Sequence, residues 1–144
     1  MKEKYDENLV FPVSESVGER PWGTEDILAL VQNKFSVKRL KINAGSKGGL
    51  QYHRLKDEVA IMVAGSMLIR YDLGDGILRE KIVRAGDVIH FPPGLIHQEE
   101  ALTQCEIIEA STPHFNDRVR MEEEYGLGKP VGLQSTSVNE IETR

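Results

Sequence analysis

Four side chains in the sequence are spaced so that they could bind one metal ion. Gln51 and His53 are two residues apart in a predicted strand, so both side chains leave the same face of the sheet. Glu58 follows a charged turn, after which an antiparallel strand can return its carboxylate to the same place. His97 follows a corner of prolines and glycine that fixes the direction of the chain. The alternative for His53 and Glu58 is a pair of side chains on the protein surface.

The four donors together indicate which metal chemistry is possible. Two neutral imidazoles, one carboxylate and one amide oxygen form a mixed nitrogen and oxygen set that suits Zn, Mn, Fe, Co or Ni. Such a set leaves coordination positions for water or substrate. An ion with open positions can polarise a bound oxygen as a Lewis acid. We therefore expect one divalent metal ion as the cofactor.

The elements that would position these residues are short. Apolar or alternating runs are separated by segments rich in glycine, proline and aspartate, which is typical of a β-sandwich or a β-barrel. The predicted strands are 36–42, 59–63, 67–71, 77–83, 88–91 and 103–109.

Three other segments differ from this pattern. Residues 116–125 are charged, lack proline and precede Gly126, which predicts one short C-terminal helix. Residues 1–18 and 127–144 are polar and short of large apolar side chains. We therefore expect a single all-β domain at 19–126, which includes the closing helix, between an N-terminal extension and a polar C-terminal tail.

The composition restricts the class of protein. A chain of 144 residues is of ordinary size for one domain with one hydrophobic core. Its net charge of −5 is spread without a basic stripe, which argues against nucleic acid as a partner. Cys105 is the single cysteine, and no run of about 18 apolar residues occurs. We therefore expect a cytoplasmic protein without disulfides and without a membrane partner.

Two longer motifs connect the four candidate ligands. Residues 51–65 have the form Gln-x-His-x4-Glu-x6-Gly, and residues 86–97 have the form Gly-x5-Pro-x-Gly-x2-His. Together they resemble the two conserved motifs of the cupins, with Gln51 in place of the first histidine and Ala101 in place of a final asparagine. The resemblance implies a single-domain cupin, a double-stranded β-helix or jelly-roll barrel, with the metal at its mouth.

Further segments narrow the resemblance. Glu19-Arg-Pro-Trp-Gly23 and residues 37–45 resemble the cupin domain of bacterial type II mannose-6-phosphate isomerases, a family that also has glutamine where Gln51 stands. Residues 117–126 resemble the segment that closes that domain. The resemblance covers about 19 to 126 and implies metal ligation by the same four residues, Gln51, His53, Glu58 and His97.

The departures from that family concern positions near the substrate. An arginine of the family is replaced by Lys56, and a tryptophan is replaced by Ala60. Two further arginines are replaced by Gln98 and Leu127. These changes argue for a substrate other than mannose 6-phosphate itself.

Several charged residues are candidates for substrate binding or proton transfer. Arg54 and Lys56 flank the metal turn and could bind a sugar phosphate, although turn charges can also simply be solvated. Arg39 and Lys41 alternate on one strand and could form a basic inward face, with an outward, solvated face as the alternative. Glu99, two residues after the last ligand, and Lys56 are the candidate catalytic bases.

The donor set and the resemblance together predict a metal-dependent aldose–ketose isomerase of carbohydrate metabolism. Its substrate would be a sugar phosphate or an activated sugar, whose proton a base moves through an enediol while the ion stabilises negative charge. A non-haem Fe(II) dioxygenase is an alternative, since two histidines and a carboxylate with open positions suit O₂ chemistry. A non-catalytic sugar-binding cupin in polysaccharide biosynthesis is another. In each case we expect a homodimer.

Overall fold

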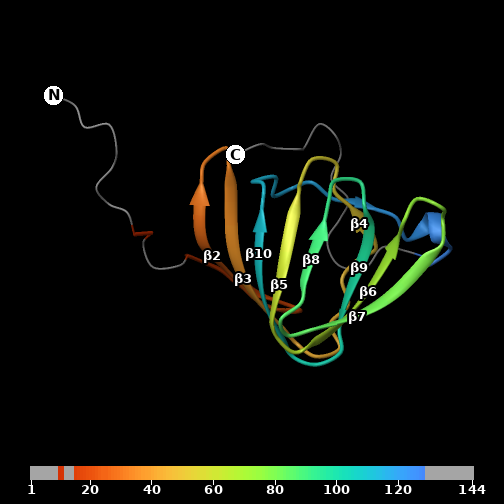
Figure 1. Ribbon diagram of the computed structural model, residues 1–144, viewed down its shortest axis with the longest axis horizontal. Helices are drawn as coiled ribbons and strands as arrows, with labels where there is room; N and C mark the ends of the chain where they lie inside the picture. Colours follow the sequence, from red (N-terminus) through yellow and green to blue (C-terminus); the bar gives the residue numbers. More distant parts are fainter. Residues whose placement is uncertain (1–9, 12–14, 129–144) are drawn as a thin grey trace.

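The protein folds into two facing β-sheets, shown in a computed structural model that describes residues 10–11 and 15–128 (Figure 1). All strand pairs are antiparallel. One sheet has, in spatial order, β1 (Glu15–Arg20), β2 (Gly23–Val31), β3 (Phe35–Ile42), β10 (Cys105–Ser111), β5 (Glu58–Ala64) and β8 (Val88–Phe91). The other has β11 (Val119–Arg120), β4 (Gln51–Tyr52), β9 (Ile96–Ala101), β6 (Ser66–Asp72) and β7 (Leu78–Arg84).

The predicted all-β architecture is confirmed. Each predicted strand is present, and its ends lie within two residues of the expected ones, because apolar side chains alternate with polar ones along most of these segments. β1 and β2 form a hairpin that the sequence did not reveal, and β1 begins at Glu15, before the expected domain start at residue 19. Of the expected C-terminal tail, only residues 127 and 128 are described.

The short helix predicted over residues 116–125 is wrong. Val119–Arg120 is extended and pairs with β4, and only Glu123–Tyr125 forms a single 3-10 turn. Gly126 does end that turn, in the left-handed conformation with φ of 70°. The segment is extended because its polar side chains make contacts with distant parts of the chain, described below. No helix in the described part of the chain is long and apolar enough to cross a membrane.

The space between the sheets is divided into an apolar part and a polar part. On the inner face of β5, Ala60 and Met62 are buried in the hydrophobic core, whereas Glu58, at the start of the same strand, lies at its polar end. β10 repeats this order, with Ile107 in the core and Glu109 level with Ala60. The buried core comprises Ala60, Met62, Met67, Ile69, Val83, Phe91, Ala101, Cys105 and Ile107. The polar part contains the candidate ligands.

The turn from β5 to β6 depends on Gly65. Its φ of +87° is disfavoured for other residues, and an added Cβ would lie 2.2 Å from the carbonyl oxygen of Gln104. Gly86 also has a positive φ, of +95°, but an added Cβ would meet nothing within 4 Å. Substituting each glycine in turn therefore distinguishes the cost of backbone strain from the cost of steric overlap.

We predict that Gly65→Ala destabilises the protein more than Gly86→Ala. Strain alone is expected to cost about 1 kcal/mol at Gly86. At Gly65 the overlap with a backbone carbonyl adds roughly 1–3 kcal/mol, since the neighbouring hairpin must move. Urea unfolding of the two variants beside the unmodified protein measures both losses. Equal losses would contradict the close approach at Gly65.

Candidate metal centre

The four predicted ligands converge in the polar part between the sheets. Gln51 in β4 is directly opposite His97 in β9, so the two side chains share the inner face of the smaller sheet. The rings of His53 and His97 have centroids 5.4 Å apart. Glu58 comes from β5 in the other sheet, and its Oε2 lies 3.6 Å from His53 Nε2.

Both candidate histidines are held in a defined orientation by backbone carbonyls. His53 Nδ1 lies 2.5 Å from the carbonyl oxygen of Asp117, and His97 Nδ1 lies 2.9 Å from that of Leu95. Because a carbonyl oxygen only accepts hydrogen bonds, Nδ1 is the donor in each ring. The His97 ring also stacks on Phe91, with centroids 4.3 Å apart. Each neutral ring is thus left with an Nε2 lone pair that can bind a metal.

Both imidazoles are expected to be neutral near pH 7. Burial is the main cause, and at His53 the positive charge of Lys56 adds to it. Together they lower the pKa of His53 to about 4, although the hydrogen bond to Asp117 acts in the opposite direction. Burial likewise lowers the pKa of His97 to about 4. Neutral imidazole is the form that binds metal, so no proton has to be displaced from these rings.

The turn between His53 and Glu58 is held by one buried carboxylate. Asp117 Oδ1 accepts a hydrogen bond from the backbone N–H of Arg54 at 3.0 Å, and Oδ2 accepts two, from Leu55 at 2.6 Å and Lys56 at 2.9 Å. Burial raises the pKa of Asp117, but these three donors outweigh it and hold the pKa below its usual range. The same residue therefore fixes the turn with its side chain and orients His53 with its backbone carbonyl.

We predict that Asp117→Asn destabilises the protein by about 1–3 kcal/mol, because an amide cannot accept all three hydrogen bonds and presents a donor to one of them. It should also weaken metal binding about tenfold or more, since the turn sets where the ligands on either side lie. Urea unfolding and metal titration measure the two effects. Asp57→Asn is the matched control, because Asp57 lies in the same turn but is about half exposed. Equal effects of both substitutions would contradict this role of Asp117.

A buried group of charges surrounds Glu58. The Lys56 ammonium lies 3.4 Å from Glu58 and 3.0 Å from Glu109. Burial lowers the pKa of Lys56, but Glu109 and Glu58 outweigh it and raise the pKa above the usual range of a lysine. Burial, followed by the charges of Glu58 and Glu109, raises the pKa of Glu99 to about 8. Burial and Glu58 also raise the pKa of Glu109.

The lowered histidine pKa values predict a loss of stability in acid for the metal-free protein. The unfolded imidazole binds a proton below about pH 6.5, whereas buried His97 does so only below about pH 4. The contribution of His97 to the free energy of unfolding is therefore complete above about pH 6.5. It falls by about 3 kcal/mol as the pH drops from there through the pKa of the folded state. Glu99 has the opposite pH dependence. The contribution of His97 is therefore isolated by subtracting the unfolding free energy of the His97→Gln variant from that of the unmodified protein at each pH. A difference that stays constant between about pH 7 and about pH 4 would contradict the shift.

The structure brings only some of the predicted substrate residues to this centre. Lys56 lies within it, and Arg54 is half-buried in the turn that Asp117 holds. Arg39 and Lys41 are on the opposite face of β3 from Lys38, which is level with the inward Glu109. Arg39 faces Asp26 with a separation of 3.4 Å, and Lys41 is exposed.

Sequence reasoning missed several charged residues that face the polar interior. Glu109 contacts Lys56, and Lys38 pairs with Glu25 at 2.9 Å. Arg118 is half-buried, and burial lowers its pKa against the opposing effect of three glutamates. The alternation in 105–111 was a usable signal, because Glu109 follows inward Ile107 by two residues.

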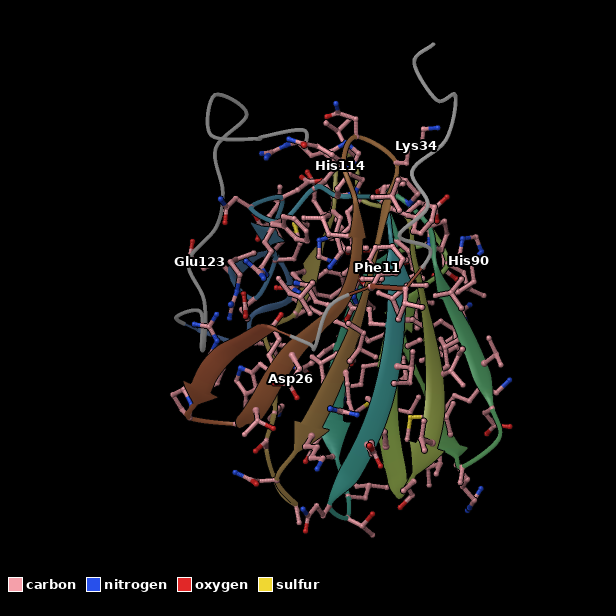
Figure 2. The ribbon with its side chains drawn as sticks, turned by 90° about the vertical axis from the view of Figure 1, so that its left-hand side faces the viewer. Phe11, Asp26, Lys34, His90, His114 and Glu123 are labelled. Atoms are coloured by element: carbon pink, nitrogen blue, oxygen red, sulfur yellow. The ribbon has the colours of Figure 1, made fainter. Side chains whose placement is uncertain are left out.

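The other two histidines lie away from this centre. His90 is 59% exposed and pairs with Asp57, with Nε2 and Oδ1 2.7 Å apart. His114 bonds the hydroxyl of Thr112 through Nδ1 at 2.8 Å. Figure 2 shows His90 beside β8 at the edge of the sheet and His114 at the top of the molecule. They therefore serve as internal controls for His53 and His97.

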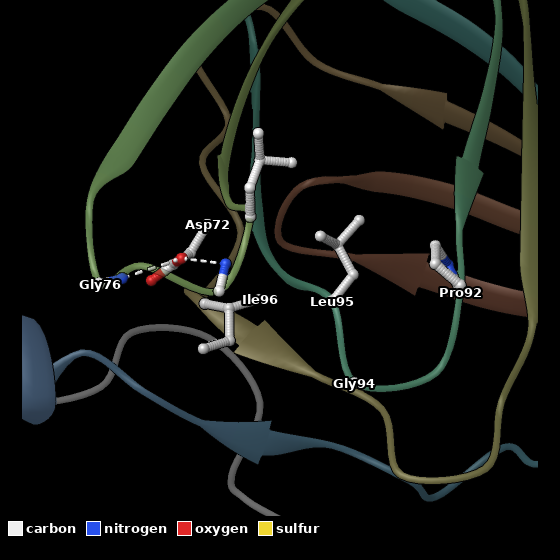
Figure 3. Close-up of a pocket in the computed structure, with 8 residues that line it drawn as sticks. Asp72, Gly76, Pro92, Gly94, Leu95 and Ile96 are labelled. Carbon is white, nitrogen blue, oxygen red and sulfur yellow. Dashed lines mark hydrogen bonds between the residues drawn. The ribbon is translucent and has the colours of Figure 1, made fainter.

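A shallow pocket of about 420 Å³ lies next to the centre but contains none of its ligands. It lies between the β6–β7 loop and the β8–β9 corner (Figure 3). It adjoins the centre through Leu95, whose carbonyl orients His97. Asp72 Oδ1 accepts the N–H groups of Gly74 and Gly76 there, so these donors are already satisfied. Its lining is Asp72, Leu73, Gly74, Gly76, Pro92, Gly94, Leu95 and Ile96.

The donors fit a divalent ion in their chemistry, but the described residues are not gathered into a finished site. Within the described residues, no three histidine, cysteine, aspartate or glutamate side chains are grouped closely enough to hold a metal. His53 Nε2 and Glu58 Oε2, both acceptors, are 3.6 Å apart. Two donors about 2.1 Å from one ion at a tetrahedral angle are about 3.4 Å apart, so the separation of this one pair suits a shared ion.

Comparison with known proteins defines the class. Residues 14–123 match the family described as Cupin, and the chain belongs to this family. Over 112 residues it is 30% identical to the xanthan biosynthesis protein XanB of Xanthomonas campestris pv. campestris (strain B100). That match covers 74% of this chain and 23% of XanB, so the chain spans about a quarter of the length of this relative.

Solved structures confirm the cupin fold. Oxalate decarboxylase from Bacillus subtilis at pH 4.6 has a TM-score of 0.64 at 19% identity, over 78% of this chain and 31% of that one. KdgF from Halomonas sp. has a TM-score of 0.60 at 18% identity, over 69% and 87%. The capsular polysaccharide assembling protein CapF from Staphylococcus aureus has a TM-score of 0.58 at 20% identity, over 72% and 28%. At these identities the likeness concerns the fold.

Proposed function

We propose that this cupin binds one divalent metal ion through Gln51, His53, Glu58 and His97, and that it is an aldose–ketose isomerase acting on a sugar phosphate or an activated sugar. The observation that carries the proposal is the pair of neutral imidazoles with anchored Nδ1 atoms, which leaves two Nε2 lone pairs beside the carboxylate of Glu58. The ion would supply electrophilic stabilisation of negative charge on the substrate oxygens. The oxalate decarboxylase that shares this fold has Mn(II) centres.

The substrate class is supported by relatives. XanB is named for xanthan biosynthesis, and CapF is named for assembling capsular polysaccharide. The type II mannose-6-phosphate isomerases that the sequence resembles also act on a sugar phosphate. The departure at Gln98 counts less than the sequence suggested, because this side chain is on the face opposite His97, where it bonds the carbonyl of Gly48 at 3.0 Å. A sugar built into a polysaccharide is therefore the preferred substrate class.

Between the two predicted bases, the contacts favour Glu99. Lys56 is already paired with two buried carboxylates, which hold it as an ammonium, whereas a glutamate has carboxylate oxygens that can accept a proton. Glu99 lies two residues after His97 on the inner face of β9, so it faces the same space as the ligands. We propose that Glu99 takes a proton from C2 of the aldose and returns it to C1.

The two alternatives predict different requirements. A non-haem Fe(II) dioxygenase with the same ligands would need O₂ and would lose all activity without it. A sugar-binding cupin would bind its ligand in a metal-dependent way without turnover. The paired state of Lys56 keeps the second alternative open, because its ammonium already has two carboxylate partners and is not offered to a phosphate.

The metal is tested by Co(II) titration of chelator-treated protein, followed by visible absorption and calorimetry. We expect one ion per chain, and about 10–100-fold weaker binding for His53→Gln and His97→Gln. His90→Gln and His114→Gln should bind like the unmodified protein. An unmodified protein that takes up no ion would refute the metal centre, as would four variants that behave alike.

The activity is tested on the metal-loaded protein with a panel of hexose and pentose phosphates, scored for aldose–ketose interconversion with and without O₂. Glu99→Gln is expected to lower kcat by about 10²–10⁴-fold while metal affinity stays unchanged. Interconversion that Glu99→Gln leaves intact would eliminate this residue as the base. Metal-dependent binding without turnover would favour the binding protein over the isomerase.

A further inference from the structure

Lys56 lies between two carboxylates in the polar interior. Its Nζ is 3.0 Å from Glu109 Oε1 and 3.4 Å from Glu58 Oε2. The side chains of the three residues are only 5–13% exposed. A buried ammonium needs a partner of opposite charge, so its position is determined by these two carboxylates.

The oxygen of Glu58 that Lys56 approaches is the one that faces His53. Glu58 Oε2 is 3.4 Å from Lys56 Nζ and 3.6 Å from His53 Nε2. An ion bound between His53 and Glu58 would therefore meet the ammonium at this oxygen. Two cations at one carboxylate oxygen repel each other strongly in a buried site.

Glu109 provides a second place for the ammonium. It comes from β10, where its backbone is level with Ala60, whereas Glu58 is level with Ser111. The carboxyls of Glu109 and Glu58 are nevertheless in hydrogen-bond contact, so a direct effect of Glu109 on Glu58 has to be separated from its effect through Lys56. The distance from Glu109 to Lys56 is the shorter of the two. The ammonium can therefore leave Glu58 without losing its ion pair.

We infer that Lys56 is the resident counter-ion of the metal-free centre, and that metal entry transfers it from Glu58 to Glu109 alone. Lys56 competes with the metal, and Glu109 reduces that competition by holding the ammonium away from Glu58. The two residues thus adjust metal affinity in opposite directions without being ligands. This inference rests on the proposed metal centre and adds a means by which its occupancy is set.

The test is a double-mutant cycle read by metal affinity. Chelator-treated protein is titrated with Co(II) by calorimetry at constant ionic strength. Lys56→Met, which removes the ammonium and keeps an unbranched side chain only one atom shorter, should tighten binding about tenfold, and Glu109→Gln should weaken it by a similar factor. In the protein that carries Lys56→Met, the further substitution Glu109→Gln should change the affinity less than about twofold, because no ammonium remains to be held.

A general effect of charge is separated by a second ion pair. Lys38 and Glu25 are 2.9 Å apart and equally buried, and no contact joins either of them to the four proposed ligands in the described structure. Lys38→Met and Glu25→Gln should each change Co(II) affinity by less than about threefold. Equal shifts for the two pairs would overturn the inference, as would a loss from Glu109→Gln that is the same with and without Lys56.

The outcomes also separate this inference from the metal centre itself. Metal binding by the unmodified protein with no tightening in Lys56→Met overturns the inference and leaves the centre standing. Metal binding by the Lys56→Met variant but not by the unmodified protein supports the competition between Lys56 and the metal. Metal binding by neither protein refutes both the inference and the metal centre. Urea unfolding checks that each variant folds, and Lys56→Gln, with the same expected tightening, replaces Lys56→Met should that variant not fold.

Discussion

The arrangement of the candidate centre depends on the buried carboxylate of Asp117. β4 and β5 belong to different sheets, and the turn between them carries His53 at one end and Glu58 at the other. Three backbone N–H groups of this turn have one common acceptor, so the turn has one shape rather than many. The carbonyl of the same residue fixes the ring of His53. One residue outside the ligand set therefore determines how the two sheets present their donors to each other.

The interior is organised to separate packing from chemistry. The apolar part is closed by side chains such as Met62, Met67 and Ile107, which supply the hydrophobic stabilisation. The polar part contains charged side chains that are expensive to bury and contribute little to stability even when paired. Such a concentration of paired charge beside two neutral imidazoles is expected at functional sites. The fold thus carries the centre at the cost of part of its possible core.

The sequence predicted the elements of the fold better than the surroundings of the candidate site. Strands such as 36–42 and 88–91 were visible because alternation and turn residues are local signals. The convergence of His53 with His97 was inferred from two motifs, and the structure brings them together. Glu109 was missed because its importance depends on its register with β5, which is set by pairing between distant segments.

The errors have the same physical origin. Residues 116–125 have a composition that suits a helix, yet Asp117 and Glu122 accept hydrogen bonds from distant parts of the chain, and Val119–Arg120 pairs with β4 as an extended segment. Arg39 and Lys41 alternate as expected, but only the register with β10 shows which face they occupy. Local patterns fix which residues share a face, and tertiary pairing decides which face is inside.

Asp117 comes later in the chain than every candidate ligand, and this has a consequence for how the protein is made. During translation, the strands that carry Gln51, Glu58 and His97 leave the ribosome before the residue that fixes their geometry. A nascent barrel without the 117–125 segment would have an unanchored His53 and a free turn. The order of synthesis therefore delays the final arrangement of the candidate ligands until the barrel strands have emerged.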